Sequence, residues 1–233
     1  MEFLLPFLIL PISDTPLKMS GGRWKQVRAA LAQIGAEAMQ YDVDGVDMCF
    51  INSPLNRELI KVGRPFLPFI VANKHNQTQA EIFGVYDQVR PRGASSVHVL
   101  SRFDLKNPLG TTPTGAKLER ILGRIIEMLN HAVDTPAYGR IKPVDIIVLT
   151  DGEPTDDPAS VIQAAARKLN EGLHHPNAVG IQFLQIGNEE GADKKLRALC
   201  DGPVRVSSLF LQVLAFGGLI LFSYREWLTL FLM

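Results

Sequence analysis

This 233-residue chain lacks an excess of charge of either sign, because 24 Lys and Arg residues balance 24 Asp and Glu residues. The basic residues are scattered rather than clustered, so we expect no nucleic-acid partner. Cysteine is scarce as well. Cys49 and Cys200 have no metal-ligand spacing and cannot build a disulfide framework. Scarce cysteine favours a reducing compartment, and we expect a cytoplasmic protein.

The chain also lacks the common catalytic motifs. It contains no G-x-S-x-G sequence of a nucleophilic hydrolase, and its five histidines lack the spacing of zinc ligands. His174 and His175 precede Pro176 and are expected in a solvated loop. We therefore predict that the protein is not an enzyme.

A P-loop is the nearest approach to an enzyme motif. Gly110 and Gly115 have the G-x-x-x-x-G spacing, but Ala116 stands where the phosphate-binding lysine must be, and Lys117 comes one place late. A P-loop-like nucleotide-binding protein is therefore kept as a lesser alternative.

Both ends of the chain are apolar. Met1–Ile12 carries Glu2 in place of a basic n-region, which is atypical of a signal peptide, and Pro6 and Pro11 suit an edge strand. Val206–Tyr224 has no charged residue and just reaches the roughly 20 residues of a membrane span. This segment is either a membrane anchor, which would make the protein membrane-associated, or a buried helix or strand that ends the domain.

Hydrophobic spacing predicts alternating helices and strands. The expected helices are Arg23–Tyr41, Thr78–Arg90, Gly115–His131, Asp156–Leu169 and Glu189–Leu199, and the expected strands are Val46–Ile51, Val144–Thr150 and Val179–Ile186. The nearly continuous apolar run of Val144–Thr150 is typical of a strand covered on both faces. This alternation predicts an α/β fold with a Rossmann-like, doubly wound, mostly parallel sheet and helices on both faces.

Two helix starts carry polar side chains. At the start of the helix Gly115–His131, the hydroxyls of Thr111, Thr112 and Thr114 are expected to accept hydrogen bonds from free backbone N–H groups. Asp156 and Asp157 are expected in the first turn of the helix that follows the strand Val144–Thr150.

Ligands of open α/β sheets bind beyond the carboxyl ends of the strands. Three features are expected to converge on that edge: Asp151, directly after the strand Val144–Thr150; the threonine-rich turn Gly110–Thr114; and the end of the N-terminal apolar run near Asp14.

Three segments together resemble a von Willebrand factor A (vWA) domain. They are Met19–Trp24 (MSGGRW), Gly110–Gly115 (GTTPTG) and Leu149–Pro154 (LTDGEP), and the resemblance covers roughly Met19 to Cys200. It implies a domain over residues 19–202 with an insertion near 94–109, preceded by an apolar segment with an atypical first strand (1–18) and followed by an apolar tail (203–233).

The resemblance also implies a metal-ion-dependent adhesion site, built by three loops. Carried over by position, its ligands are Asp14, Thr112 and Asp151. Such a site holds Mg²⁺ or another divalent cation through oxygen ligands. A protein partner supplies a further carboxylate.

The first of these loops departs from the family pattern. Pro16 and Lys18 stand where the family has two serines. At ~4 Å and an effective dielectric constant near 20, Lys18 would repel a divalent ion by about 8 kcal/mol. The resemblance therefore implies a degraded adhesion site.

These observations predict a non-catalytic, vWA-like domain that binds proteins, with a dependence on Mg²⁺ through a partial adhesion site. The alternative is a vWA-like domain tethered to a membrane by Val206–Tyr224.

Overall fold

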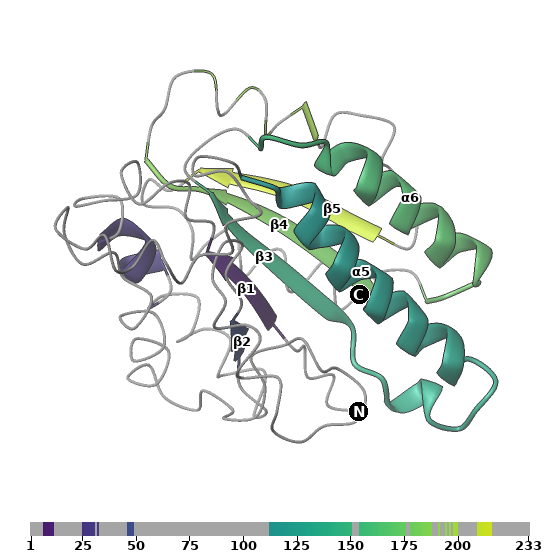
Figure 1. Ribbon diagram of the computed structural model, residues 1–233. Helices are drawn as coiled ribbons and strands as arrows, with labels where there is room; N and C mark the ends of the chain where they lie inside the picture. Colours follow the sequence, from purple (N-terminus) through teal and green to yellow (C-terminus); the bar gives the residue numbers. More distant parts are fainter. Residues whose placement is uncertain are drawn as a thin grey trace, which may run out of the picture.

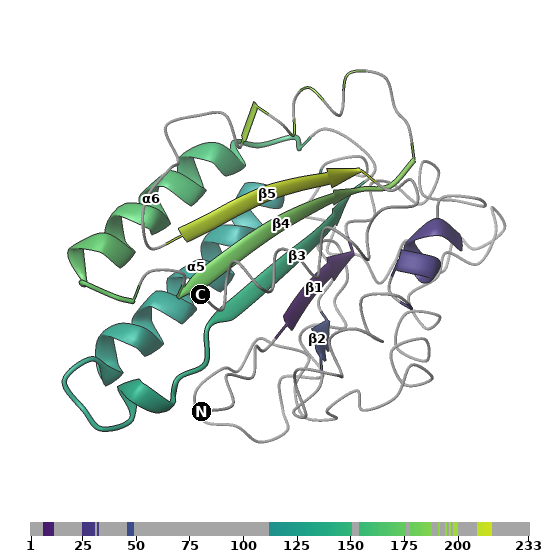
Figure 2. The ribbon, with the colours of Figure 1, turned by 180° about the vertical axis from the view of Figure 1, so that it is seen from behind.

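The structure, a computed structural model, describes residues 7–11, 25–30, 32, 46–48, 112–150, 154–175, 178–187, 191, 194, 196, 198–199 and 209–215. Over these residues a parallel sheet lies behind two long helices (Figure 1), and its other face is turned to the viewer in Figure 2. The prediction of an α/β fold with a parallel sheet is confirmed. The predicted helices on both faces are not settled by the described residues.

The described sheet has five strands, in the spatial order β2-β1-β3-β4-β5, and every neighbouring pair is parallel. The strands are β1 (Phe7–Pro11), β2 (Val46–Met48), β3 (Val144–Thr150), β4 (Val179–Gln185) and β5 (Leu209–Ala215). The described helices with assigned bounds are α5 (Thr114–Ala132), α6 (Pro158–Glu171) and the short 3-10 helix η2 (Tyr138–Arg140).

Strand β1 corrects one expectation. Its proline content suggested an edge strand, but β1 lies between β2 and β3. Pro11 is the last residue of the strand, beyond the last pair with β2, Ile9↔Met48. A missing N–H group interrupts a hydrogen-bond ladder least at such a position.

The C-terminal apolar run supplies strand β5. Leu209–Ala215 pairs with β4, so this part of Val206–Tyr224 forms the terminal strand that was one of two alternatives. Among the described residues, no helix combines the length and hydropathy needed to cross a membrane. The sheet thus includes one strand from the segment before residues 19–202 and one from the segment after them. The predicted helix Thr78–Arg90 and the segment 94–109 lie outside the described residues.

The core between the helices and the sheet follows the predicted spacing. Six apolar residues on the inner side of α5 are buried: Leu118, Ile121, Leu122, Ile125, Ile126 and Leu129. Alternate residues of β3 and β4 complete this core, together with four residues of α6; the strand residues are Val144, Ile146, Val148, Val179, Ile181 and Phe183. The prediction that β3 is covered on both faces is confirmed, because all seven of its residues are buried.

The second face of the sheet buries a carboxyl group. Asp145 of β3 alternates with the core residues and therefore points to the face opposite α5 and α6, where it is 0% exposed. Its Oδ2 accepts a hydrogen bond of 2.9 Å from Nε2 of Gln182 on β4. Oδ1 has no hydrogen-bond partner among the residues that the structure describes. Burial raises the pKa of Asp145 well above its usual value, and the bond from Gln182 opposes this only in part.

A second buried polar group corrects the sequence-based expectation of a solvated loop. His175 is exposed, but His174 is only 4% exposed. Its Nε2 lies 2.7 Å from Oδ1 of Asn130 at the end of α5, and its Nδ1 lies 3.0 Å from the hydroxyl of Tyr138 in η2. With a proton on Nε2, a neutral ring satisfies both contacts, and burial lowers the pKa of His174.

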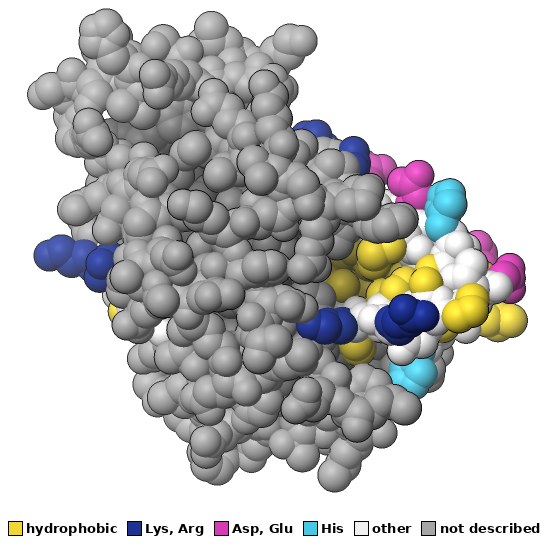
Figure 3. Space-filling view, turned by 90° about the horizontal axis from the view of Figure 1, so that it is seen from below, with side chains coloured by type: hydrophobic (Ala, Val, Ile, Leu, Met, Phe, Trp, Pro, Cys, Tyr) yellow, Lys and Arg dark blue, Asp and Glu magenta, His cyan; other side chains and the backbone are white. Residues whose placement is uncertain are grey.

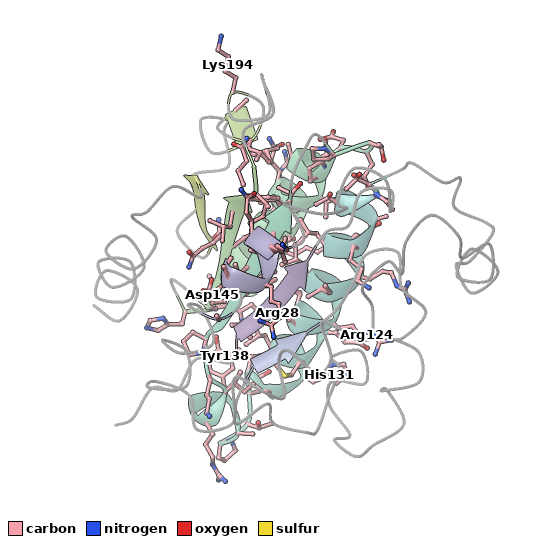
Figure 4. The ribbon with its side chains drawn as sticks, turned by 90° about the vertical axis from the view of Figure 1, so that its left-hand side faces the viewer. Arg28, Arg124, His131, Tyr138, Asp145 and Lys194 are labelled. Atoms are coloured by element: carbon pink, nitrogen blue, oxygen red, sulfur yellow. The ribbon has the colours of Figure 1, made fainter. Side chains whose placement is uncertain are left out.

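Asn130, Tyr138 and His174 form a cluster, the His174 cluster, which joins the end of α5 to two connections, α5–β3 and α6–β4, at the amino edge of the sheet. Figure 3 shows the molecule from below, where described side chains of both charge signs and histidines lie among hydrophobic ones. In Figure 4, Tyr138 and His131 lie toward the lower end, while Lys194 lies at the upper end.

A Cβ atom on Gly172 would lie 2.5 Å from the His174 ring, so the cluster requires glycine there.

Helix α6 ends in a strained residue. Leu173 has a φ of 51°, the left-handed region, and is 88% exposed. Its N–H group donates to the Asn170 carbonyl at 3.0 Å, and that of His174 donates to the Leu169 carbonyl at 3.1 Å. This is a Schellman ending, in which glycine usually occupies the left-handed position.

Leu173→Gly is expected to raise the free energy of unfolding by about 1 kcal/mol, because it relieves the left-handed strain of a side chain that buries little surface. Leu173→Ala keeps the Cβ atom and should change stability little. Urea unfolding of both variants measures the difference, and equal stabilities for the two would contradict this explanation.

Asp145→Asn is expected to remove a pH dependence of stability. Because the folded carboxyl has a raised pKa, the unfolded chain ionises first as pH rises above about 4. The free energy of unfolding should therefore fall over the range between the unfolded and folded pKa values. Urea unfolding at several pH values should show this component in the natural protein and not in the variant. Asp134→Asn, at an exposed position, is the control, and parallel profiles for all three proteins would refute the prediction.

Candidate functional site

The strand order places a candidate site at the carboxyl edge of the sheet. From β1 the chain proceeds to β2 on one side, and it then returns past β1 to β3 on the other side. A crevice forms beyond the carboxyl ends of two strands at such a reversal, and ligands bind there in open α/β sheets. The reversal lies between β1 and β3, whose ends pair at Pro11↔Leu149.

Two of the predicted ligands follow these two strands directly. Asp14 comes three residues after the end of β1, and Asp151 is the first residue after β3. Both lie outside the described residues. The strand register therefore brings the chain to the expected edge at both points, and the placement of the two carboxylates stays a prediction.

The third predicted ligand, Thr112, is described. It is 1% exposed and lies two residues before α5. Its N–H group donates to the hydroxyl of Thr155 at 2.8 Å, and its carbonyl accepts from the N–H group of Thr155 at 3.1 Å. Since Thr155 lies on the loop that follows β3, these bonds fix Thr112 to the loop that also contains Asp151.

The start of α5 corrects the expectation of threonine capping. No side chain at the N-cap of α5 forms a capping hydrogen bond, and the hydroxyl of Thr114 instead lies 3.4 Å from the Thr112 carbonyl, to which it donates. Asp156, from the loop after β3, supplies the cap. Its Oδ1 accepts from the Gly115 N–H group and its Oδ2 from that of Ala116, both at 2.8 Å.

The neighbouring carboxylate caps a different helix. Asp157 is the N-cap of α6, and its side chain accepts hydrogen bonds from the N–H group and the hydroxyl of Ser160, with Pro158 in the first turn. These bonds, the one from the hydroxyl first, lower the pKa of Asp157. The expectation that both acids lie in the first turn of this helix was wrong: Asp157 is the N-cap of α6, and Asp156 binds the start of α5.

The described part of this edge offers oxygen rather than nitrogen or sulfur as a ligand for a metal ion. Among the described residues, no three His, Cys, Asp or Glu side chains gather where they could hold a metal ion. Both oxygens of Asp156 accept hydrogen bonds from N–H groups of α5. Of the three predicted ligands, only Thr112 is described, and its side chain offers a hydroxyl oxygen. A hydroxyl ligand suits a hard cation such as Mg²⁺.

No known sequence family matches this chain, and no curated protein does. Solved structures resemble this chain at low identity, among them the following two. Proximal thread matrix protein 1 from the mussel byssus has a TM-score of 0.47 and 14% identity, over 96% of this chain and 47% of that one. A von Willebrand factor type A protein from Catenulispora acidiphila has a TM-score of 0.45 and 15% identity, over 96% of this chain and 42% of that one. The chain thus spans less than half the length of either structure, and these structural neighbours are vWA domains.

Proposed function

We propose that this chain is a non-catalytic, vWA-like domain that binds a protein partner through a divalent cation at the carboxyl edge of its sheet. One observation carries the proposal. The loop after β3, which contains Asp151, is hydrogen-bonded to Thr112 beside the point where the strand order reverses. Thr112 is therefore held against the loop whose sequence contains a second predicted ligand.

The strand order also supports a doubly wound architecture. β1 leads to β2 in one direction across the sheet, and β3 leads to β4 in the opposite direction. Because parallel crossovers are almost always right-handed, the helical segment 25–30 between β1 and β2 belongs on the face opposite α6. Val27 and Ala30 of that segment are fully buried, as the contact face of such a helix would be.

The ion would be Mg²⁺, held by Asp14, Thr112 and Asp151. Three side-chain ligands leave several of the octahedral positions of Mg²⁺ to water, and a carboxylate from the partner protein takes one of them. The partner is therefore a protein with an accessible Asp or Glu side chain. A cytoplasmic location is part of the proposal.

The described contacts give the P-loop alternative no support. A P-loop needs free backbone N–H groups at the start of its helix to hold phosphate. Here the N–H groups of Thr112, Thr114, Gly115 and Ala116 are all occupied by oxygen atoms of the chain itself. The membrane-tethered alternative needs a spanning segment within Val206–Tyr224, and Leu209–Ala215 of that segment is a sheet strand.

Calorimetric titration with Mg²⁺ or Mn²⁺ tests the proposed ion site. The natural chain should bind one ion, and Asp151→Ala should weaken the affinity about tenfold or more, because a charged ligand is lost; a tenfold change corresponds to about 1.4 kcal/mol. Asp134→Ala removes an exposed carboxylate after α5 and should leave the affinity unchanged. Absence of binding by the natural chain and the variant alike would remove the ion from the proposal.

Lys18→Ser is expected to tighten ion binding. The substitution removes a positive charge that would repel the cation, and it adds a hydroxyl ligand where the related domains have one. The same titration should give a dissociation constant lower by about tenfold or more. Lys142→Ser, on the short connection between η2 and β3, is the matched control. Equal affinities for Lys18→Ser and the natural chain would show that Lys18 lies away from the ion.

A further inference from the structure

The turn before α5 is held by a partner far away in the sequence. Thr112 and Thr155 are 43 residues apart, yet they exchange two hydrogen bonds, one to a side-chain oxygen and one between backbones. Pro113 follows Thr112 and restricts its backbone to extended conformations, which suits this strand-like pairing. The position of Thr112 is therefore set by the loop after β3.

The first turn of α5 is held by the same loop. Gly115 and Ala116 donate to the two oxygens of Asp156, and both bonds measure 2.8 Å. Bonds from N–H groups to a carboxylate are stronger than neutral ones, and the negative charge lies favourably at the positive end of the helix dipole. Since α5 has no acidic residue in its own first turn and no capping side chain of its own, Asp156 supplies both functions.

The two segments are also packed closely. A Cβ atom on Gly115 would lie 3.1 Å from Oδ2 of Asp156 and 3.1 Å from the carbonyl carbon and oxygen of Asp157. The backbone of α5 thus approaches the loop so closely that a side chain at Gly115 would require its neighbours to shift by a few tenths of an ångström. Hydrogen bonds and packing together make a continuous contact from Thr112 to Ala116.

We infer that Thr155 and Asp156 form a latch that holds Thr112 in the position needed for the ion, so that they are positioning residues rather than ion ligands. This inference rests on the proposed function. The loop whose sequence contains Asp151 also fixes the threonine, so the latch would couple the segments that carry two of the proposed ligands. Binding of the ion and closure of the latch are then linked, and each favours the other.

Asp156→Ala and Asp156→Asn test the latch, with Asp157→Ala as the matched control. Amide hydrogen exchange reports the latch without any ion. Asp156→Ala should reduce protection at Gly115 and Ala116 and also at Thr112 and Thr155, and Asp156→Asn should do so less, since it keeps one acceptor oxygen. Asp157→Ala should reduce protection at Ser160 in α6 only. If Thr112 keeps its full protection after Asp156→Ala, the latch is refuted, whether or not the chain binds metal.

Calorimetric titration with Mg²⁺ then tests the linkage. Asp156→Ala should weaken binding about tenfold, Asp156→Asn should weaken it less, and Asp157→Ala should leave it unchanged. Thr112→Val removes the ligand hydroxyl but keeps the latch bonds, so it should weaken binding while exchange at Gly115 stays slow. Unchanged affinity in Asp156→Ala, with exchange at Thr112 accelerated, would overturn the positioning role. A further outcome is that the natural chain binds no Mg²⁺ while Asp156→Ala loses amide protection at Thr112, Gly115, Ala116 and Thr155. This outcome would support the latch and refute the proposed ion site.

Discussion

The parallel pairing of β3 with β1 on one side and β4 on the other is the constraint on which the rest of the structure depends. β3 is buried along its whole length, and a shift of its register by one position would turn the carboxyl of Asp145 toward the core and away from Gln182. Its register with β1, from Phe7↔Asp145 to Pro11↔Leu149, aligns the carboxyl ends of the two strands. The loops that leave these strands must therefore begin at the same edge, and Thr112 is hydrogen-bonded to one of them.

Elements whose pattern is local could be predicted from the sequence. The strand Val144–Thr150 has the predicted bounds, and α5 differs from its predicted range by one residue at each end, because continuous apolar runs and a sustained helical period identify such elements without help from distant residues. The segment Val206–Tyr224 was harder. An uncharged apolar run suits a membrane span and a buried strand equally, and only the pairing of Leu209–Ala215 with β4 distinguishes them.

Contacts between segments that are distant in the chain could not be predicted from the sequence. The features that the sequence analysis missed are all contacts of this kind. Asp156 was assigned to the helix that follows it, since capping rules are local, yet its partners lie about 40 residues earlier. His174 was expected in solvent because it precedes a proline, but Tyr138 and Asn130 enclose it from two other elements. Asp145 did carry a signal, a single carboxyl in an otherwise apolar strand, and its match with Gln182 depends on a register that the sequence does not specify.

The adjacent acids Asp156 and Asp157 show how the chain could keep carboxylates beside the proposed ion site without adding them to it. Each is committed to N–H groups at a helix start, Asp156 at α5 and Asp157 at α6, so their charges are balanced locally by helix dipoles. Had Asp156 been free, it would be a candidate to coordinate the proposed cation and to fill a position left open for the partner. A cation coordinated in that way would offer one position fewer to a carboxylate from another protein. The latch therefore would serve recognition twice, because it positions Thr112 and because it withholds a competing ligand from the ion.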